Sequence, residues 1–249
     1  KLCDKVGIPA GVVNFVTGPG SVVGNELSKN PKIGMASLTG SVSAGKRIMS
    51  AAAEHVGEVS LELGGNAPAI VCDDADIDEA VKDIIGSRFD NNGELCNNVQ
   101  RVYVQEGVAD EFMEKLVAGV KAIATGDTVK NPDIGMGPLI NKAALEKVDS
   151  QVKQAVKEGA KVVVGGKPME GKGFFYEPTI LTNVTQEGSA IQDEIFGPVL
   201  PVMTFKNLKD AVEMCNDSTM GLTSGIFTKS LDRAAYAINE IQAGETYVN

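Results

Sequence analysis

The sequence has 249 residues, 43% of them hydrophobic, and a formal net charge of −10. This length and apolar content are enough for one large domain or two smaller ones with buried cores. The acidic charge argues against nucleic acid or an anionic membrane as a partner, because either would favour a basic face.

The ends of the sequence predict elements that continue beyond them. Residues 1–9 are typical of the last turns of a helix that stops at Gly7 and Pro9. Residues 246–249 predict a strand with nothing after it. We therefore expect the chain to be part of a longer protein.

Predicted strands and helices alternate along the chain. The strands are short apolar runs bounded by glycine, proline or polar residues, and they cover residues 12–16, 33–38, 59–63, 69–72, 101–104, 161–164, 178–181, 199–205 and 223–227. The helices cover residues 21–30, 43–55, 76–89, 108–124, 143–157, 208–216 and 231–241. This alternation predicts an α/β fold of parallel sheets with helices on both faces, and the run 12–16 is expected to be a buried strand.

The four cysteines stand far apart at Cys3, Cys72, Cys96 and Cys215. None forms a CxxC pair, and the single histidine, His55, has no cysteine near it, so we expect neither a metal site nor a disulfide scaffold. Free thiols in an acidic chain without an apolar membrane-spanning run or a signal peptide indicate a cytoplasmic protein with no membrane partner.

Glycine-bearing turns between strands and helices are candidates for phosphate binding. Residues 17–21 contain only a GxG, which is a weak signal. Gly40 and Gly45 flank a predicted helix start, where backbone N–H groups and the Ser41 hydroxyl can hold a pyrophosphate. A serine N-cap with a packing glycine explains the same residues equally well. Neither turn has the GxGxxG spacing of a standard Rossmann fingerprint.

Cys96 differs from the other cysteines in its neighbours. Residues 90–98 are rich in asparagine and acidic side chains, which is typical of a partly exposed reactive thiol and unusual in a packed core. Glu62 lies 34 residues earlier, and on an alternating strand it faces opposite to its leucine neighbours, either toward a site or toward solvent. A thiolate that attacks an aldehyde and a carboxylate that deprotonates the hydrolytic water together allow thioester chemistry.

Five segments, in this order and spacing, resemble the aldehyde dehydrogenase superfamily: residues 38–45, 61–65, 89–96, 194–198 and 221–225. Residues 136–141, 221–225 and 244–249 are most similar to lactaldehyde and glycolaldehyde dehydrogenases. The resemblance implies NAD(P)-dependent oxidation of a small aldehyde to the carboxylic acid through a cysteine thiohemiacetal and thioester. It also implies that residues 1–62 are the C-terminal part of a Rossmann-like NAD(P)-binding domain and that residues 63–249 are an α/β catalytic domain truncated at its C-terminal end.

The resemblance further implies roles for individual residues. Cys96 would be the nucleophile and Glu62 the general base. The cofactor-binding set would be Gly40, Ser41 and Gly45 near the phosphates, Leu63 and Gly64 at the ring and the site floor, Glu194 on the nicotinamide ribose and Phe196 beside the nicotinamide. The implied cofactor is NAD, with NADP not excluded. No metal is implied, and the full-length protein would be a homo-oligomer, dimeric or tetrameric.

One position departs from the family pattern. The family usually has glutamine two residues before the nucleophile, and this chain has Glu94. A carboxylate that faces Cys96 would disfavour its thiolate, whereas one that points to solvent would have no effect.

Two alternatives stay open at this point. Coenzyme A rather than water could take the acyl group, although Glu62 argues against this. The chain could also be a structural or interaction fragment with an inert site, and we expect the isolated 249 residues to be inactive as a dehydrogenase.

Overall fold

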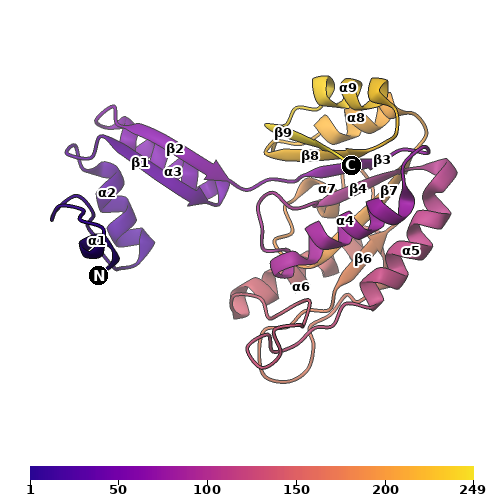
Figure 1. Cartoon of the computed structure of the whole chain (residues 1–249), viewed down its shortest axis with the longest axis horizontal. Coiled ribbons are helices and arrows are strands. Elements are labelled where there is room, and N and C mark those ends of the chain that lie inside the picture. The colour runs from indigo at the N-terminus through magenta and orange to yellow at the C-terminus, as the bar shows by residue number, and fades with distance from the viewer. The chain divides into compact units, whose positions relative to one another are not determined.

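The computed structural model describes all 249 residues, which fold into two compact units, Lys1–Leu63 and Gly64–Asn249 (Figure 1). The expected domain division, after residue 62, lies one residue from this boundary. No helix in either unit has the length and apolar content that crossing a bilayer requires.

The first unit is built on a strand–helix–strand motif. Its helices are α1 (Leu2–Lys5), a π-helical turn (Gly20–Gly24), α2 (Asn25–Lys29) and α3 (Val42–Ala53), and its strands are β1 (Met35–Gly40) and β2 (Glu58–Leu63). The two strands pair in parallel from Met35↔Glu58 to Gly40↔Leu63, with α3 as the crossover. One side chain in two on each strand is exposed, as the pleat of a strand covered on one face requires.

The predicted buried strand at residues 12–16 is wrong. These residues form turns and irregular backbone, and Phe15 is 90% exposed. An apolar run becomes a strand only where another strand satisfies its backbone N–H and C=O groups. Neither β1 nor β2 pairs with residues 12–16, so the run has no such partner in this unit.

The second unit contains a seven-stranded sheet in the order β5-β6-β7-β4-β3-β8-β9. Its strands are β3 (Pro68–Val71), β4 (Arg101–Gln105), β5 (Lys161–Val164), β6 (Thr179–Thr182), β7 (Val199–Phe205), β8 (Thr223–Phe227) and β9 (Glu245–Val248). All neighbours pair in parallel except β5, which runs antiparallel to β6 at one edge. The predicted parallel sheet is therefore confirmed apart from this edge strand.

Helices cover both faces of this sheet (Figure 1). They are α4 (Ile77–Phe89), α5 (Ala109–Lys121), α6 (Lys142–Lys157), α7 (Ser189–Gln192), α8 (Leu208–Asn216) and α9 (Leu231–Glu240). On β3, Ala69 and Val71 join the core beneath α4 and α5, whereas Ile70 joins the core beneath α8 and α9, as does Cys72 directly after the strand. This alternation explains why β3 is apolar at every position.

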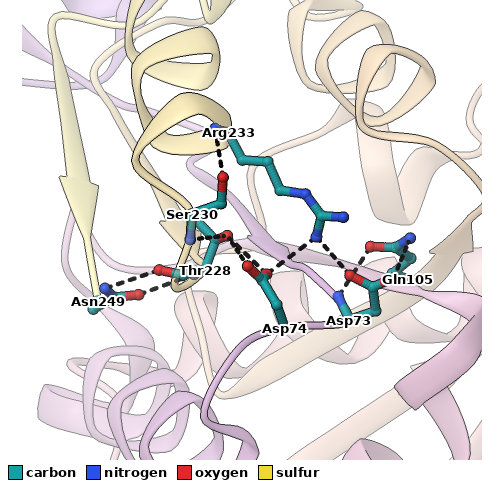
Figure 2. A network of polar contacts seen from close by, with 7 residues as sticks. All are labelled: Asp73, Asp74, Gln105, Thr228, Ser230, Arg233 and Asn249. Carbon is teal, nitrogen blue, oxygen red and sulfur yellow. Dashed lines mark hydrogen bonds and ion pairs between the residues drawn. The ribbon is translucent and has the colours of Figure 1, made fainter.

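A polar network closes the carboxyl edge of the sheet (Figure 2). Its members follow or end β3, β4, β8 and β9 or begin α9: Asp73, Asp74, Gln105, Thr228, Ser230, Arg233 and Asn249. Arg233 Nη1 donates to Asp73 Oδ1 at 2.5 Å and to Asp74 Oδ1 at 3.1 Å, and the Thr228 hydroxyl donates to Asp74 at 2.7 Å. The strand ends at this edge are thus fixed to one another by their own side chains.

Candidate active site

The candidate site residues of the second unit lie at the opposite, amino edge of the sheet. β7, β4, β3 and β8 are adjacent and parallel, so the segments that lead into them meet at one edge. Glu194 and Phe196 lead into β7, Cys96 into β4, and Gly64 into β3. Strand order therefore gathers residues that are more than one hundred positions apart in sequence.

Cys96 lies in the loop between α4 and β4. The helix ends at Phe89, and the chain turns sharply through Asn91, Asn92 and Gly93, whose φ angles are 46°, 61° and 72°. Asparagine and glycine are the residues that tolerate this left-handed backbone best. Cys96 itself is partly exposed, as its polar neighbours predict.

Hydrogen bonds on both sides of Cys96 fix this loop. The Thr223 hydroxyl donates to the Asn97 carbonyl at 3.1 Å, and the Val99 N–H donates to Ser87 Oγ at 3.0 Å. Before the cysteine, Asn92 Nδ2 donates to the Pro138 carbonyl at 2.8 Å. The loop is thereby anchored to β8, α4 and the segment before α6.

Glu94 takes part in the same anchoring. Its carboxylate accepts the Ile140 N–H, at 3.1 Å from Oε2 and 3.3 Å from Oε1. This acidic side chain thus holds the Cys96 loop to residues 138–141 and does not point freely into solvent.

Replacing Glu94 by glutamine is expected to raise the melting temperature at neutral pH. Burial raises the pKa of Glu94, and the Ile140 N–H offsets this only in part. A carboxyl group whose pKa is higher in the folded state stabilises the fold below its unfolded pKa and loses this contribution as the pH rises through the folded pKa. The amide oxygen of glutamine still accepts the Ile140 N–H, so the gain should disappear near pH ~4. Thermal unfolding of both proteins from acid to neutral pH measures the increase in melting temperature. An increase that persists in acid would show that the charge of Glu94 is not its cause.

Two consecutive glycines form the contact between the site segments. A Cβ on Gly64 would lie 2.5 Å from Glu194 Oε2, and a Cβ on Gly65 would lie 2.8 Å from the Cys96 carbonyl oxygen and 3.1 Å from Leu222 Cβ. Any side chain larger than hydrogen would displace these groups. The segment that leads into β3 thus touches both the Glu194 carboxylate and the backbone of Cys96.

Replacing Gly65 by alanine is expected to destabilise the protein by about 1–3 kcal/mol, because the new methyl group meets backbone that cannot rotate away. Gly86 in α4 is a matched control, since a Cβ there meets nothing within 4 Å. Alanine at Gly86 should be neutral or stabilise by up to about 1 kcal/mol. Urea unfolding compares the two variants, and equal stability would show that the contact at Gly65 relaxes without cost.

Glu194 is held in a partly buried position with one free acceptor. Burial raises the pKa of its carboxyl group, while the Gly65 N–H and the positive charges of Lys147 and Arg88 act in the opposite direction. Its backbone carbonyl accepts Gln151 Nε2 from α6 at 3.1 Å. Glu194 Oε1 is buried and has no hydrogen-bond partner in the protein. A buried carboxylate oxygen without a donor suits a ligand that brings a hydroxyl group.

The thiols of this chain differ in exposure. Cys72 and Cys215 are buried, and burial raises the pKa of Cys72 to about 11 and that of Cys215 to about 12. Because the thiolate is the reactive form, limiting iodoacetamide should label Cys96 well before these two. Peptide mass spectrometry measures the order, with Cys3, which is also partly exposed, as the internal comparison. Faster labelling of Cys3, Cys72 or Cys215 would argue against a special role for Cys96.

In the first unit, the predicted phosphate-binding residues surround the start of α3. Ser41 is the N-cap, and its Oγ accepts the Ala44 N–H at 3.3 Å and lies 3.1 Å from Ser43 Oγ. Gly40 ends β1, and Gly45 packs so closely on Leu63 that a Cβ would lie 2.7 Å from its Cδ2 atom. Ser41 is exposed at the helix N-terminus, so its capping role leaves the neighbouring N–H groups at the surface.

Glu62 lies on β2 and is exposed, between the partly buried Leu61 and Leu63. The predicted alternation of this strand is confirmed. Glu58 stands four residues earlier on the same exposed face.

The sequence did not reveal three residues that the structure places around Glu194: Arg88, Lys147 and Gln151. Lys147 and Gln151 are one helical turn apart on α6, so their spacing put them on one face of that helix. Only the packing of α6 against the segment before β7 shows what this face meets.

Comparisons with known proteins identify the family of this chain. The profile of the Aldehyde dehydrogenase family matches residues 1–249. Lactaldehyde dehydrogenase of Escherichia coli is 53% identical over the whole chain, which spans 52% of that protein, and its crystal structure superposes with a TM-score of 0.97 over 98% of this chain and 51% of that one. Succinate-semialdehyde dehydrogenase [NADP(+)] of Escherichia coli is 41% identical over the whole chain and 52% of its own length. A 3,6-anhydro-L-galactose dehydrogenase, solved in complex with NAP, is 44% identical with a TM-score of 0.96 over 99% of this chain and 52% of that one.

The chain thus spans about half the length of the relatives that it matches. The sequence match extends from its first residue to its last, and the fold match covers 98% of it. The chain belongs to the aldehyde dehydrogenase family.

Proposed function

We propose that the enzyme containing this sequence oxidises a small aldehyde of the lactaldehyde or glycolaldehyde type to its carboxylic acid, with Cys96 as the nucleophile. The observation that supports this most is the contact of Gly64 and Gly65 with both the Glu194 carboxylate and the Cys96 loop. It brings a partly exposed thiol and a carboxylate with a free oxygen to one edge of one sheet. The identity to lactaldehyde dehydrogenase favours a small hydroxyaldehyde as the substrate.

The proposed cofactor is NAD, with NADP as the alternative. When bound, the nicotinamide supplies the acceptor for the hydride that leaves the substrate. The free Glu194 Oε1 fits a ribose hydroxyl, Phe196 is partly exposed two residues later, and the N-terminus of α3 with Ser41 fits a phosphate group. NADP is kept as the alternative because one relative is named for NADP(+) and another was solved in complex with NAP.

The proposed chemistry runs through two covalent states of Cys96. The thiolate adds to the aldehyde carbon and forms a thiohemiacetal, whose oxyanion is stabilised by backbone N–H groups. Loss of hydride leaves a thioester on Cys96. Glu62 takes a proton from water, the resulting hydroxide attacks the thioester carbon, and the acid and the free thiol are released. The enzyme is further proposed to act as a homo-oligomer, as the family resemblance implies.

An assay of substrate and acceptor tests this proposal. The enzyme is mixed with glycolaldehyde or lactaldehyde and either NAD or NADP, and the reduced nicotinamide is followed by its absorbance while the acid is identified by chromatography. Acid formation without coenzyme A is the expected result. Turnover that requires coenzyme A and yields an acyl-coenzyme A thioester would show that coenzyme A, and not water, accepts the acyl group. Absence of turnover with any small aldehyde would contradict the proposal.

A further inference from the structure

Arg88 is a completely buried arginine in the last turn of α4. Withdrawing a guanidinium from water costs free energy unless its N–H groups find acceptors. Burial lowers the pKa of Arg88 to about 9, although the nearby charge of Glu194 acts in the opposite direction. The acceptors that offset this cost show what the side chain does.

The guanidinium joins two segments of the candidate site. Nη1 donates to Asn98 Oδ1 at 3.1 Å and to the Val99 carbonyl at 3.3 Å, two and three residues after Cys96. Nη2 donates to the Ile195 carbonyl at 2.7 Å and to the Gly197 carbonyl at 2.5 Å. These last two residues flank Phe196. One nitrogen therefore serves the Cys96 loop and the other serves the segment that carries Glu194 and Phe196.

The two segments also touch directly, at a point where no side chain fits. Gly93, three residues before Cys96, has a φ of 72°, and a Cβ there would lie 2.4 Å from the Gly197 carbonyl oxygen. The backbones therefore approach so closely that no side chain on Gly93 could bridge them. Arg88, reaching in from α4, supplies the side-chain hydrogen bonds between the segments.

We propose that Arg88 is a positioning residue that sets the Cys96 loop and residues 194–197 in one fixed relation. The proposal rests on the proposed function, in which Cys96 attacks the aldehyde while Glu194 and Phe196 hold the nicotinamide riboside. Hydride transfer needs the substrate carbon and its acceptor in close register, and displacement by about 1 Å can cost on the order of 10²-fold in rate. Holding both segments on one rigid group is a direct way to keep that register.

The chemistry of the side chain explains why this position needs arginine. The planar guanidinium presents its donors in a fixed fork, so two nitrogens can address different carbonyl groups at once. Lysine keeps the charge but has a single nitrogen, which cannot occupy both positions. Arg88→Lys therefore removes the link while it retains the positive charge near Glu194.

A second buried arginine offers a matched control. Arg101 donates to the carbonyls of Asn66, Met214 and Cys215 and to the Tyr103 hydroxyl, at 2.7–3.2 Å, so it fastens the sheet to the end of α8. None of these acceptors belongs to the Cys96 loop or to residues 194–197. Arg101→Lys makes the same substitution at the same degree of burial without cutting the proposed link.

Hydrogen exchange followed by mass spectrometry tests the link without aldehyde or cofactor. In Arg88→Lys, amides in residues 90–99 and 194–199 are expected to exchange about tenfold faster or more, in parallel, because hydrogen bonds of a charged donor are lost. Amides of α5 should keep their wild-type rates. Arg101→Lys should leave residues 194–199 unchanged. Loosening of only one segment, or equal acceleration throughout the unit, would overturn the proposal.

Steady-state kinetics test the catalytic consequence. Arg88→Lys should lower kcat by about tenfold or more, while KM for aldehyde and for cofactor changes by no more than about twofold. An unchanged kcat with both segments loosened would overturn the positioning role.

If Arg88→Lys does not fold, Asn98→Ala, which removes one acceptor and keeps the guanidinium, should show the same pattern with smaller amplitude. Lack of turnover in the wild-type enzyme contradicts the proposed function, whereas independent exchange in the two segments contradicts the role of Arg88, so the two failures are distinguishable.

Discussion

Replacing Cys96 by alanine is expected to lower aldehyde-dependent reduction of the nicotinamide cofactor by a factor on the order of 10⁴ or more. Alanine has no nucleophile, so neither the thiohemiacetal nor the thioester can form. Because Cys96 lies in a partly exposed loop and not in one of the cores, the substitution should leave the melting temperature nearly unchanged. Single-turnover and steady-state absorbance measurements determine the effect.

Cys3→Ser is the control for this variant. Cys3 is also partly exposed and lies in the first unit, in the short helix α1. Its replacement should leave turnover within about twofold, as expected for a surface position. Turnover that survives in Cys96→Ala, or that falls equally in both variants, would exclude Cys96 as the nucleophile.

Replacing Glu62 by glutamine is expected to slow steady-state turnover by roughly 10²–10⁴-fold and to leave the first turnover fast. Glutamine cannot accept a proton from water, so the thioester should accumulate after hydride has left. Rapid mixing should therefore show a burst of reduced cofactor, close to one per active site, followed by a slow phase. Mass spectrometry of the quenched enzyme should find the acyl group on Cys96.

Glu58→Gln is a matched control for the Glu62 variant. Both glutamates lie on β2, four residues apart, and both are exposed on the same face. The two variants remove the same charge from the same strand, so only a specific role separates them. A burst that falls together with the steady state in Glu62→Gln, or an equal slowing in Glu58→Gln, would assign Glu62 another role.

Local sequence patterns were sufficient to predict most of the helices and strands. The predicted bounds of β7, β8 and α8 match the structure residue for residue, because each is a compact apolar pattern with clear boundaries. Residues 12–16 have an equally apolar pattern, yet they form no strand. Pairing depends on which strand lies alongside, and that is not encoded in the run itself.

The candidate site was predictable only in part, for a similar reason. Polar neighbours revealed the exposure of Cys96, since composition around a residue reports its surroundings. Arg88 carries no such signal. An arginine in the last turn of a helix is typically a solvent-exposed charge that interacts with the helix dipole. Its burial follows from the strand order that brings the segments before β4 and β7 together.

Arg88 and Arg101 also bracket the stretch of chain that carries Cys96. Trypsin cleaves after arginine and lysine, and no other such residue lies between them, so cleavage at both releases residues 89–101 as one peptide. Both arginine side chains are at most 1% exposed, so trypsin cannot bind them in the folded chain. Release of this peptide under native conditions therefore tracks how often the region opens. Proteolysis thus measures, without any label, how firmly the folded chain holds the segment that contains Cys96.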